Sequence, residues 1–246
     1  MKKILLTGCL LLITACQSAT PTLAPESAPT TTLPPTPVPV AETPTIPPAP
    51  TDSPTPAPPP LFFTDEFDTP STFWQFFQTG GTDAPLTAIE NGQLRVDISS
   101  PDTWHLGIHN AHTYSNILIR AKISASPSGS VGLVCRYNET QGWYEFNVAS
   151  DGTYSALFGQ WLAPGIAKYL PLATDANSGL NPGNINSEIG LSCQDNFMIL
   201  YVNETLLRRL DVTRYGLAEG NIGISAASFV ETPLTAFFDW VKVSEE

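Results

Sequence analysis

Positive charge is scarce in this chain. Eleven lysines and arginines stand against 23 aspartates and glutamates, which gives a formal net charge of −12 at pH 7. Proteins that bind nucleic acid neutralise phosphates with clustered Lys and Arg side chains, and the basic residues here are sparse and scattered. The sequence therefore predicts no nucleic-acid partner, and its acidity favours solubility.

Several catalytic signatures are also missing from the sequence. It contains no Gly-x-Ser-x-Gly nucleophile elbow, no glycine-rich phosphate-binding loop and no His-Glu-x-x-His zinc pair. No window has the periodicity of a long amphipathic helix. These absences argue against the enzyme classes that use such motifs and against a helical fold.

The first residues carry a targeting pattern. Lys2 and Lys3 precede an apolar run that is too short for a permanent membrane-spanning helix and ends before Cys16. Residues 13–16, Ile-Thr-Ala-Cys, resemble the bacterial lipobox. The resemblance implies a signal peptide over residues 1–15, lipidation of Cys16, and a cell-envelope location with the domain anchored to the membrane outside the cytoplasm. An ordinary signal peptide with an incidental cysteine is the alternative.

The composition changes sharply over residues 16–60. Pro, Thr, Ala and Ser dominate this segment, which has no Lys or Arg. It has too little apolar surface to offset the entropy of ordering, and its X-Pro pairs favour an extended conformation. The sequence predicts a disordered linker here and one globular domain over residues 61–246. A proline-rich ligand for a partner domain is the other interpretation.

Alternating apolar runs fill the globular domain. They are bounded by Gly, Pro, Asn, Asp or Ser, and turn pairs such as Asn91-Gly92 separate them. This pattern predicts an all-β fold in which two antiparallel sheets form a sandwich. The predicted strands are residues 93–98, 104–109, 117–123, 131–137, 143–148, 154–158, 188–194, 197–202, 221–226 and 236–243.

Two cysteines lie within these runs. Cys135 and Cys193 each share a face with apolar residues of their own strand. An even pair in an exported protein usually forms a disulfide, which is our prediction, and two separate buried thiols are the alternative.

A set of short motifs extends over the domain. They are residues 63–68, 132–137, 143–146, 151–154, 200–203, 220–224 and 237–243. Together these motifs resemble the concanavalin A-like lectin/glucanase superfamily, and the ends of the domain resemble glycoside hydrolase family 16 and laminin G-like jelly rolls, whose first and last strands pair. The resemblance implies a curved antiparallel jelly roll that binds a ligand, commonly a glycan, on its concave face or rim loops.

The chain departs from that family in two places. The family's Asn-Gly hairpin is Asn203-Glu204 here, which weakens the turn signal. Family 16 enzymes carry Glu-x-Asp-x-x-Glu on one strand, which sets two carboxylates about 5 to 5.5 Å apart for retaining chemistry. This chain has a lone Glu145 followed by Asn147. The sequence therefore predicts a non-catalytic binding module for glycans or cell-envelope polysaccharide.

Two other functions stay open from the sequence. A family 16-like hydrolase would need distant carboxylates to converge, and the candidates are Asp97, Asp102 and Glu145. A structural or protein-adhesion domain is the third reading.

Aromatic residues supply the candidate ligand contacts. Sugar rings present apolar C–H faces, so a planar aromatic beside amide or carboxylate groups is typical of a glycan site. We expect Trp143 and Trp161 to act as platforms, with Arg136, Glu145 and Asn147 as the hydrogen-bonding set. The alternative is that these tryptophans only pack the sandwich, as we expect of Trp74 and Trp240.

The sequence supports a metal site less strongly than a glycan site, and it requires no cofactor. The resemblance implies that Asp239 holds a structural Ca²⁺ on the convex side, and the alternative is that Asp239 hydrogen-bonds to the first strand. His105 and His109 would lie about 13 Å apart on one strand, too far to share a zinc ion. We expect these imidazoles, and His112, to be solvated or to contact the ligand.

Overall fold

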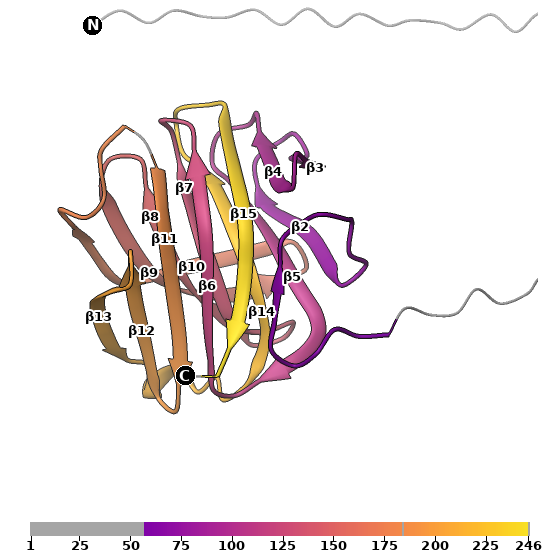
Figure 1. Ribbon diagram of the computed structural model, residues 1–246. Coiled ribbons are helices and arrows are strands. Elements are labelled where there is room, and N and C mark those ends of the chain that lie inside the picture. The colour runs from indigo at the N-terminus through magenta and orange to yellow at the C-terminus, as the bar shows by residue number, and fades with distance from the viewer. Residues whose placement is uncertain (1–56, 184, 246) are drawn as a thin grey trace, which may run out of the picture. The chain divides into compact units, whose positions relative to one another are not determined.

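The computed structural model describes residues 57–183 and 185–245 (Figure 1). The predicted signal peptide, Cys16 and the linker as far as residue 56 lie outside the described residues, so lipidation and the linker stay predictions.

Two antiparallel sheets packed face to face make up the domain, as the alternating pattern predicts (Figure 1). Sheet A has eight strands, in the order β13 (Thr205–Asp211), β12 (Phe197–Val202), β11 (Ile185–Gln194), β6 (Ile117–Ala125), β15 (Leu234–Ser244), β4 (Gln93–Ile98) and β3 (Leu86–Glu90), with β1 (Phe63–Asp65) paired to β15. Sheet B has seven, in the order β10 (Ile166–Ala176), β9 (Thr153–Ala163), β8 (Gly142–Ala149), β7 (Ser130–Asn138), β14 (Gly220–Ser228), β5 (Thr103–Tyr114) and β2 (Trp74–Gly80).

Helical structure is almost absent from the described residues, where a single 3₁₀ turn, Thr213–Tyr215, follows β13. None of the helical structure in this part of the chain is long and apolar enough to cross a membrane.

The core lies between the sheets and follows from the alternation along each strand. In β8 the side chains of Tyr144, Phe146 and Val148 are buried in this core. A disulfide joins Cys135 of β7 to Cys193 of β11 with their Cα atoms 6.5 Å apart, which confirms the predicted bond and ties sheet B to sheet A.

The first and last strands of the domain pair, as the family resemblance implies. β1 runs antiparallel to β15, with Phe63 opposite Val243. Because β4 pairs with residues 234–238 of β15 and β1 with residues 241–243, β1 continues sheet A beyond the end of β4.

A bulge in β15 overturns one sequence prediction. The register between β15 and β6 shifts between Phe238 and Trp240, so that Asp239 is an extra residue in the strand. Phe238 and Val241 therefore both point into the core. Trp240, which we expected in the core, lies half-buried on the outer face of sheet A. Trp74 is buried in the core, as expected.

Candidate functional site

Sheet B curls so strongly that its opposite edges touch. Tyr169 of β10 stacks on Trp104 of β5 with ring centroids 4.5 Å apart. The Tyr169 hydroxyl lies 2.7 Å from the Thr79 hydroxyl of β2. Because β10 and β2 are the two edge strands of this sheet, its concave face is enclosed by its own strands.

A second apolar cluster fills that concave face, separate from the core between the sheets. Trp143 lies at its centre, with its ring centroid 5.1 Å from that of Trp161 and 5.7 Å from that of Tyr169. The buried members are Leu106, Ile108, Val134 and Trp143, with Phe77, Trp104, Tyr137, Trp161, Ala167 and Tyr169 packed against them. The face that the resemblance implies as a ligand groove is thus occupied by the protein's own aromatic side chains.

Glu145 is buried beneath this cluster, on the same face of β8 as Trp143 and Asn147. Trp143 Nε1 donates to one carboxylate oxygen at 3.0 Å, and Asn147 Nδ2 donates to the other at 2.8 Å. Desolvation by burial raises the pKa of Glu145, and these two hydrogen bonds oppose the shift. The Ser225 hydroxyl donates to Asn147 Oδ1 at 2.9 Å and so fixes the amide.

The other candidate carboxylates lie elsewhere. Asp97 is on the outer face of sheet A, where Arg95 Nε lies 2.8 Å from its Oδ2, and Asp102 is exposed just before β5. In the described ranges, no carboxylate is among the groups that shift the pKa of Glu145. Glycoside hydrolysis needs two carboxyl groups, one on each side of the linkage. Among the described residues, the concave face carries one carboxyl group, that of Glu145, and it is enclosed.

Arg136 does not join the group that contains Glu145. A register shift between Cys135 and Asn138 and a φ of 51° at Arg136 turn its side chain away. Its Nη1 donates to the Leu217 carbonyl and its Nη2 to the Ser115 carbonyl, both at 2.8 Å. Burial lowers the pKa of Arg136. The structure thus brings Trp143, Glu145, Asn147 and Trp161 together and leaves Arg136 apart.

The concave cluster opens at one end, at a hollow we call the Trp161 pocket. It has a volume of about 490 Å³ and is lined by Tyr137, Glu139, Thr140, Trp161 and residues 162–165. Asn138 Oδ1 accepts from Thr140 N at 2.9 Å and from Gln141 N at 3.1 Å, which fixes the turn beside it. Two aromatic rings next to a carboxylate and a hydroxyl suit a sugar ring.

Tyr137 and Glu139 are absent from the set expected from sequence. The Glu139 charge raises the pKa of Tyr137, although burial contributes more, so the carboxylate lies close to the phenol. The sequence signal that points to these two residues is the polar turn at residues 138–141. This turn follows the aromatic end of a strand and therefore lies at the rim of the sandwich.

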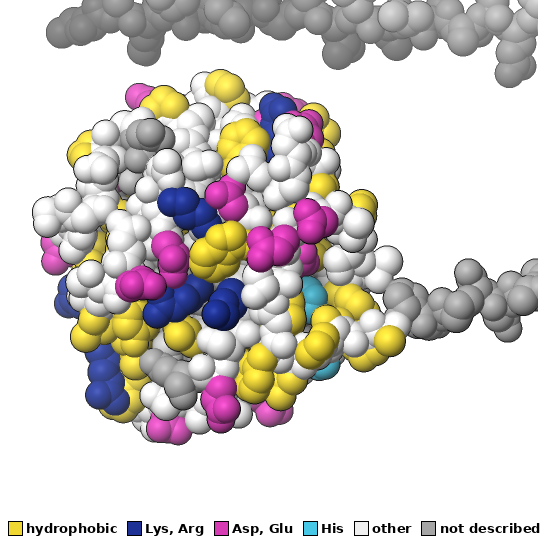
Figure 2. All heavy atoms as spheres, viewed as in Figure 1, with side chains coloured by type: hydrophobic (Ala, Val, Ile, Leu, Met, Phe, Trp, Pro, Cys, Tyr) yellow, Lys and Arg dark blue, Asp and Glu magenta, His cyan; other side chains and the backbone are white. Residues whose placement is uncertain are grey.

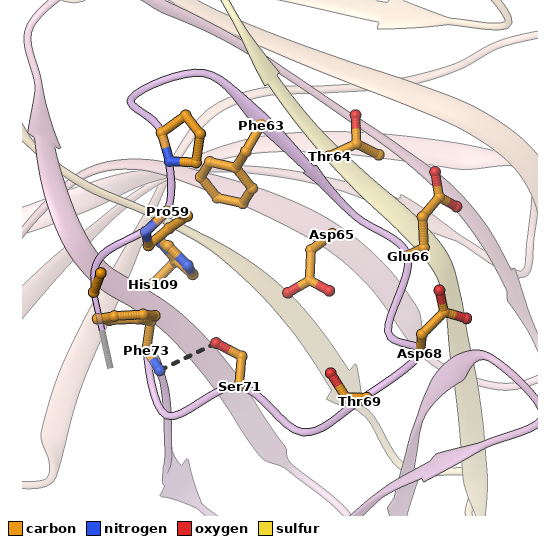
Figure 3. Close-up of a pocket in the computed structure, with 12 residues that line it drawn as sticks. Pro59, Phe63, Thr64, Asp65, Glu66, Asp68, Thr69, Ser71, Phe73 and His109 are labelled. Carbon is orange, nitrogen blue, oxygen red and sulfur yellow. Dashed lines mark hydrogen bonds between the residues drawn. The ribbon is translucent and has the colours of Figure 1, made fainter. Parts of the chain in front are cut away.

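A second hollow lies where the N-terminal segment crosses the end of sheet B (Figure 3). Its volume is about 420 Å³, with Phe63, Phe73 and His109 on one side and acidic residues on the other. Asp65 is used structurally, because its two oxygens accept from Trp74 Nε1 at 2.8 Å and from Phe67 N at 2.9 Å.

The histidines differ from expectation. His105 and His109 are buried, and desolvation lowers the pKa of each from 6.5 to about 4. His105 stacks on Phe76 at 5.5 Å, and His109 packs 4.7 Å from Phe63. His112 Nε2 lies 2.7 Å from the Pro59 carbonyl oxygen. The first two imidazoles are therefore core groups, since alternation on β5 turns both toward the inside of the sandwich.

Comparison with known structures finds the same architecture at low sequence identity. A family 16 endo-glucanase from Bacteroides ovatus gives a TM-score of 0.53 at 10% identity, covering 74% of this chain and 99% of its own. A prokaryotic β-1,3-1,4-glucanase (lichenase) from a mouse hindgut metagenome gives 0.51 at 12%, covering 75% and 99%. The fold is a concanavalin A-like jelly roll. No protein-family model matches the chain, and no curated protein sequence matches it.

The jelly roll places Asp239 at the bulge of β15, where its Oδ1 accepts from Gln93 Nε2 of β4. This partner belongs to β4, so the hydrogen bond to the first strand, which was the alternative to calcium, is not the one formed. Within residues 57–183 and 185–245, no group of three or more His, Cys, Asp or Glu side chains is arranged to hold a metal ion. Calcium binding at Asp239 stays a prediction.

Proposed function

We propose that this jelly roll binds a glycan and does not cleave it. The observation that carries the proposal is Glu145, a single buried carboxylate whose two oxygens are occupied by Trp143 and Asn147. A retaining or inverting mechanism needs a second carboxyl group and an open path to the sugar linkage. Neither is available on this concave face in the described part of the chain.

The ligand contacts of this proposal lie at the Trp161 pocket. Trp161 and Tyr137 provide ring surface, and Glu139 and Thr140 provide hydrogen-bonding groups for hydroxyls. Trp143 packs against Trp161 from behind and restricts its ring, and the hydrogen bond to Glu145 holds Trp143 in turn. A rigid ring loses little conformational entropy when a sugar stacks on it.

The structural neighbours support a carbohydrate ligand by analogy alone. The two neighbours reported above with TM-scores over 0.5 are described as glucanases, and fold does not by itself determine function. We further propose that the domain is displayed from the cell envelope, with lipidated Cys16 in the membrane and the proline-rich segment as a spacer.

A combined retention and cleavage assay tests the proposal. The whole chain is run through native gels that contain neutral polysaccharides (mixed-linkage β-glucan, laminarin or galactomannan), and reducing ends are measured after prolonged incubation. We expect slowed migration in at least one gel and no new reducing ends. Trp161→Ala should weaken that retention about fivefold to tenfold, as expected for the loss of one aromatic contact.

The matched control for this assay is Leu206→Ala, which also truncates a large apolar side chain, one that is 59% exposed at the edge of sheet A. It should leave retention unchanged. Reducing ends that disappear in Glu145→Gln would show a hydrolase instead, and the absence of retention in every gel would overturn glycan binding.

A further inference from the structure

The outer face of sheet A carries a second aromatic centre, on the opposite side of the sandwich from the concave face of sheet B. The bulge at Asp239 turns Trp240 out of the core and onto this face. A bulge that re-aims one side chain commonly marks a functional position, because it gives up a core contact and a regular ladder. Figure 2 looks onto these strands and shows hydrophobic, basic and acidic side chains side by side.

The strand register places charged side chains around Trp240. Across the sheet, Trp240 of β15 lies opposite Lys122 of β6, and Lys122 lies opposite Glu188 of β11. In the neighbouring row, Lys242 of β15 lies opposite Arg120 of β6. Arg120, Lys122 and Lys242 therefore lie close together around Trp240.

Arg120 is held in place by two neighbours. Its Nη1 donates to Glu188 Oε1 at 3.0 Å, and its guanidinium lies 5.7 Å from the centre of the Tyr201 ring. Gly190 lies between Arg120 and Tyr201 in the register, and a Cβ there would come within 3.2 Å of Tyr201 Cβ. The glycine thus leaves room for this packing, and the donors of Arg120 are oriented before any ligand arrives.

Trp240 and Arg120 line a hollow of about 420 Å³, which we call the Trp240 face. The other lining residues are Thr64 and Glu66 of the β1 segment, Glu188, Glu204 and Lys242. Three acidic and two basic side chains share this lining, so an ionic ligand of either sign would meet repulsion. Vicinal hydroxyls of a sugar can donate to a carboxylate and accept from a lysine or arginine at the same time.

We propose that the Trp240 face is a second sugar-binding surface, suited to a neutral hexose chain whose C–H face stacks on Trp240. The Trp240 face and the Trp161 pocket belong to different sheets. One domain would therefore hold two chains of a polymer, or two separated parts of one chain, and bind a polysaccharide more tightly than a short oligosaccharide. The inference extends the proposed function but does not depend on the Trp161 pocket.

Single and double variants of the whole chain test this inference in the same neutral-polysaccharide gels. Trp240→Ala should weaken retention about fivefold to tenfold, Trp240→Phe should restore most of it, and Trp161→Ala with Trp240→Ala should abolish it. Thermal unfolding of each variant checks the fold. A polyuronate such as polygalacturonate serves as the charged probe and should be retained less than the neutral chains.

The outcomes separate the two proposals. Wild-type retention that is lost in Trp161→Ala and unchanged in Trp240→Ala would overturn the second surface and leave the proposed function intact. Stronger retention by polygalacturonate would overturn the neutral-ligand assignment. No retention of the wild type in any gel would overturn both.

Discussion

The Tyr169 hydroxyl lies 2.7 Å from the Thr79 hydroxyl, although these residues belong to the two opposite edge strands of sheet B. This contact closes the concave face over Glu145 and confines any ligand to the rim or to the outside of the sandwich. It also brings the two edge strands of sheet B next to each other.

Removing the Tyr169 hydroxyl should weaken the contact between the two edge strands and leave the aromatic cluster packed. Tyr169→Phe keeps the stack on Trp104 and loses one half-buried hydrogen bond, so the free energy of unfolding should fall by about 1 kcal/mol. Urea denaturation measures the change, with Tyr215→Phe, near the surface, as the control. An unchanged midpoint for Tyr169→Phe would mean that the two edges do not pair through this contact.

The disulfide should contribute strongly to stability. Cys135 and Cys193 are 58 residues apart in sequence, and closing a loop of that length stabilises the folded state by about 4 kcal/mol in the chain-entropy model. The double variant Cys135→Ala with Cys193→Ala should therefore unfold at markedly lower urea concentration. Reducing the wild type in urea should reproduce the shift, and it should have no effect on the double variant.

Burial of Glu145 makes stability depend on pH. The unfolded chain ionises this group near its ordinary pKa of 4.5, whereas the folded state holds the proton to higher pH. The wild type therefore loses stability from this group as pH rises above 4.5. Glu145→Gln cannot ionise, so its unfolding free energy relative to wild type should increase between pH 4.5 and 7. Exposed Glu219→Gln is the control, and parallel pH profiles for Glu145→Gln and wild type would contradict the burial.

The two buried histidines make stability depend on pH in the opposite direction to Glu145. Their folded pKa of about 4 lies below the ordinary 6.5, so the unfolded chain takes up protons first as the pH falls. The stability that they contribute is complete above pH 6.5 and is lost between pH 6.5 and about 4. An NMR titration of the imidazole C–H signals should show His105 and His109 neutral down to about pH 4. Titration of either one near 6.5 would contradict its place in the core.

The alternation of apolar and polar residues predicted the interior strands well and missed the strands at the sheet edges. Every run expected from sequence lies within an observed strand, and β4 and β12 match it residue for residue. The strands at the ends of the two sheets, β2, β3, β10 and β13, were not predicted by alternation, and neither was β1, which pairs with β15 alone. An edge strand buries less of each face, so its apolar and polar residues need not alternate. In β13, for example, no residue is fully buried.

The site was harder to predict because it depends on bulges and on curvature. One register shift moves Arg136 away from Glu145, and another moves Trp240 from the core to the surface. A one-residue insertion reverses the side of every later residue, and no sequence signal marked either insertion. Asn203 and Glu204 both adopt positive φ, 48° and 63°, so the hairpin forms even without the glycine of the family. Curvature of sheet B, which encloses Trp143, has no local signature.

Binding without cleavage is tested most sharply when both are measured on the same sample. The wild-type chain and Glu145→Gln are each incubated with neutral polysaccharide, and retention and reducing ends are recorded together. We expect both proteins to be retained and neither to release reducing ends above a protein-free blank. Reducing ends produced by the wild type and absent with Glu145→Gln would show that the domain cleaves its ligand.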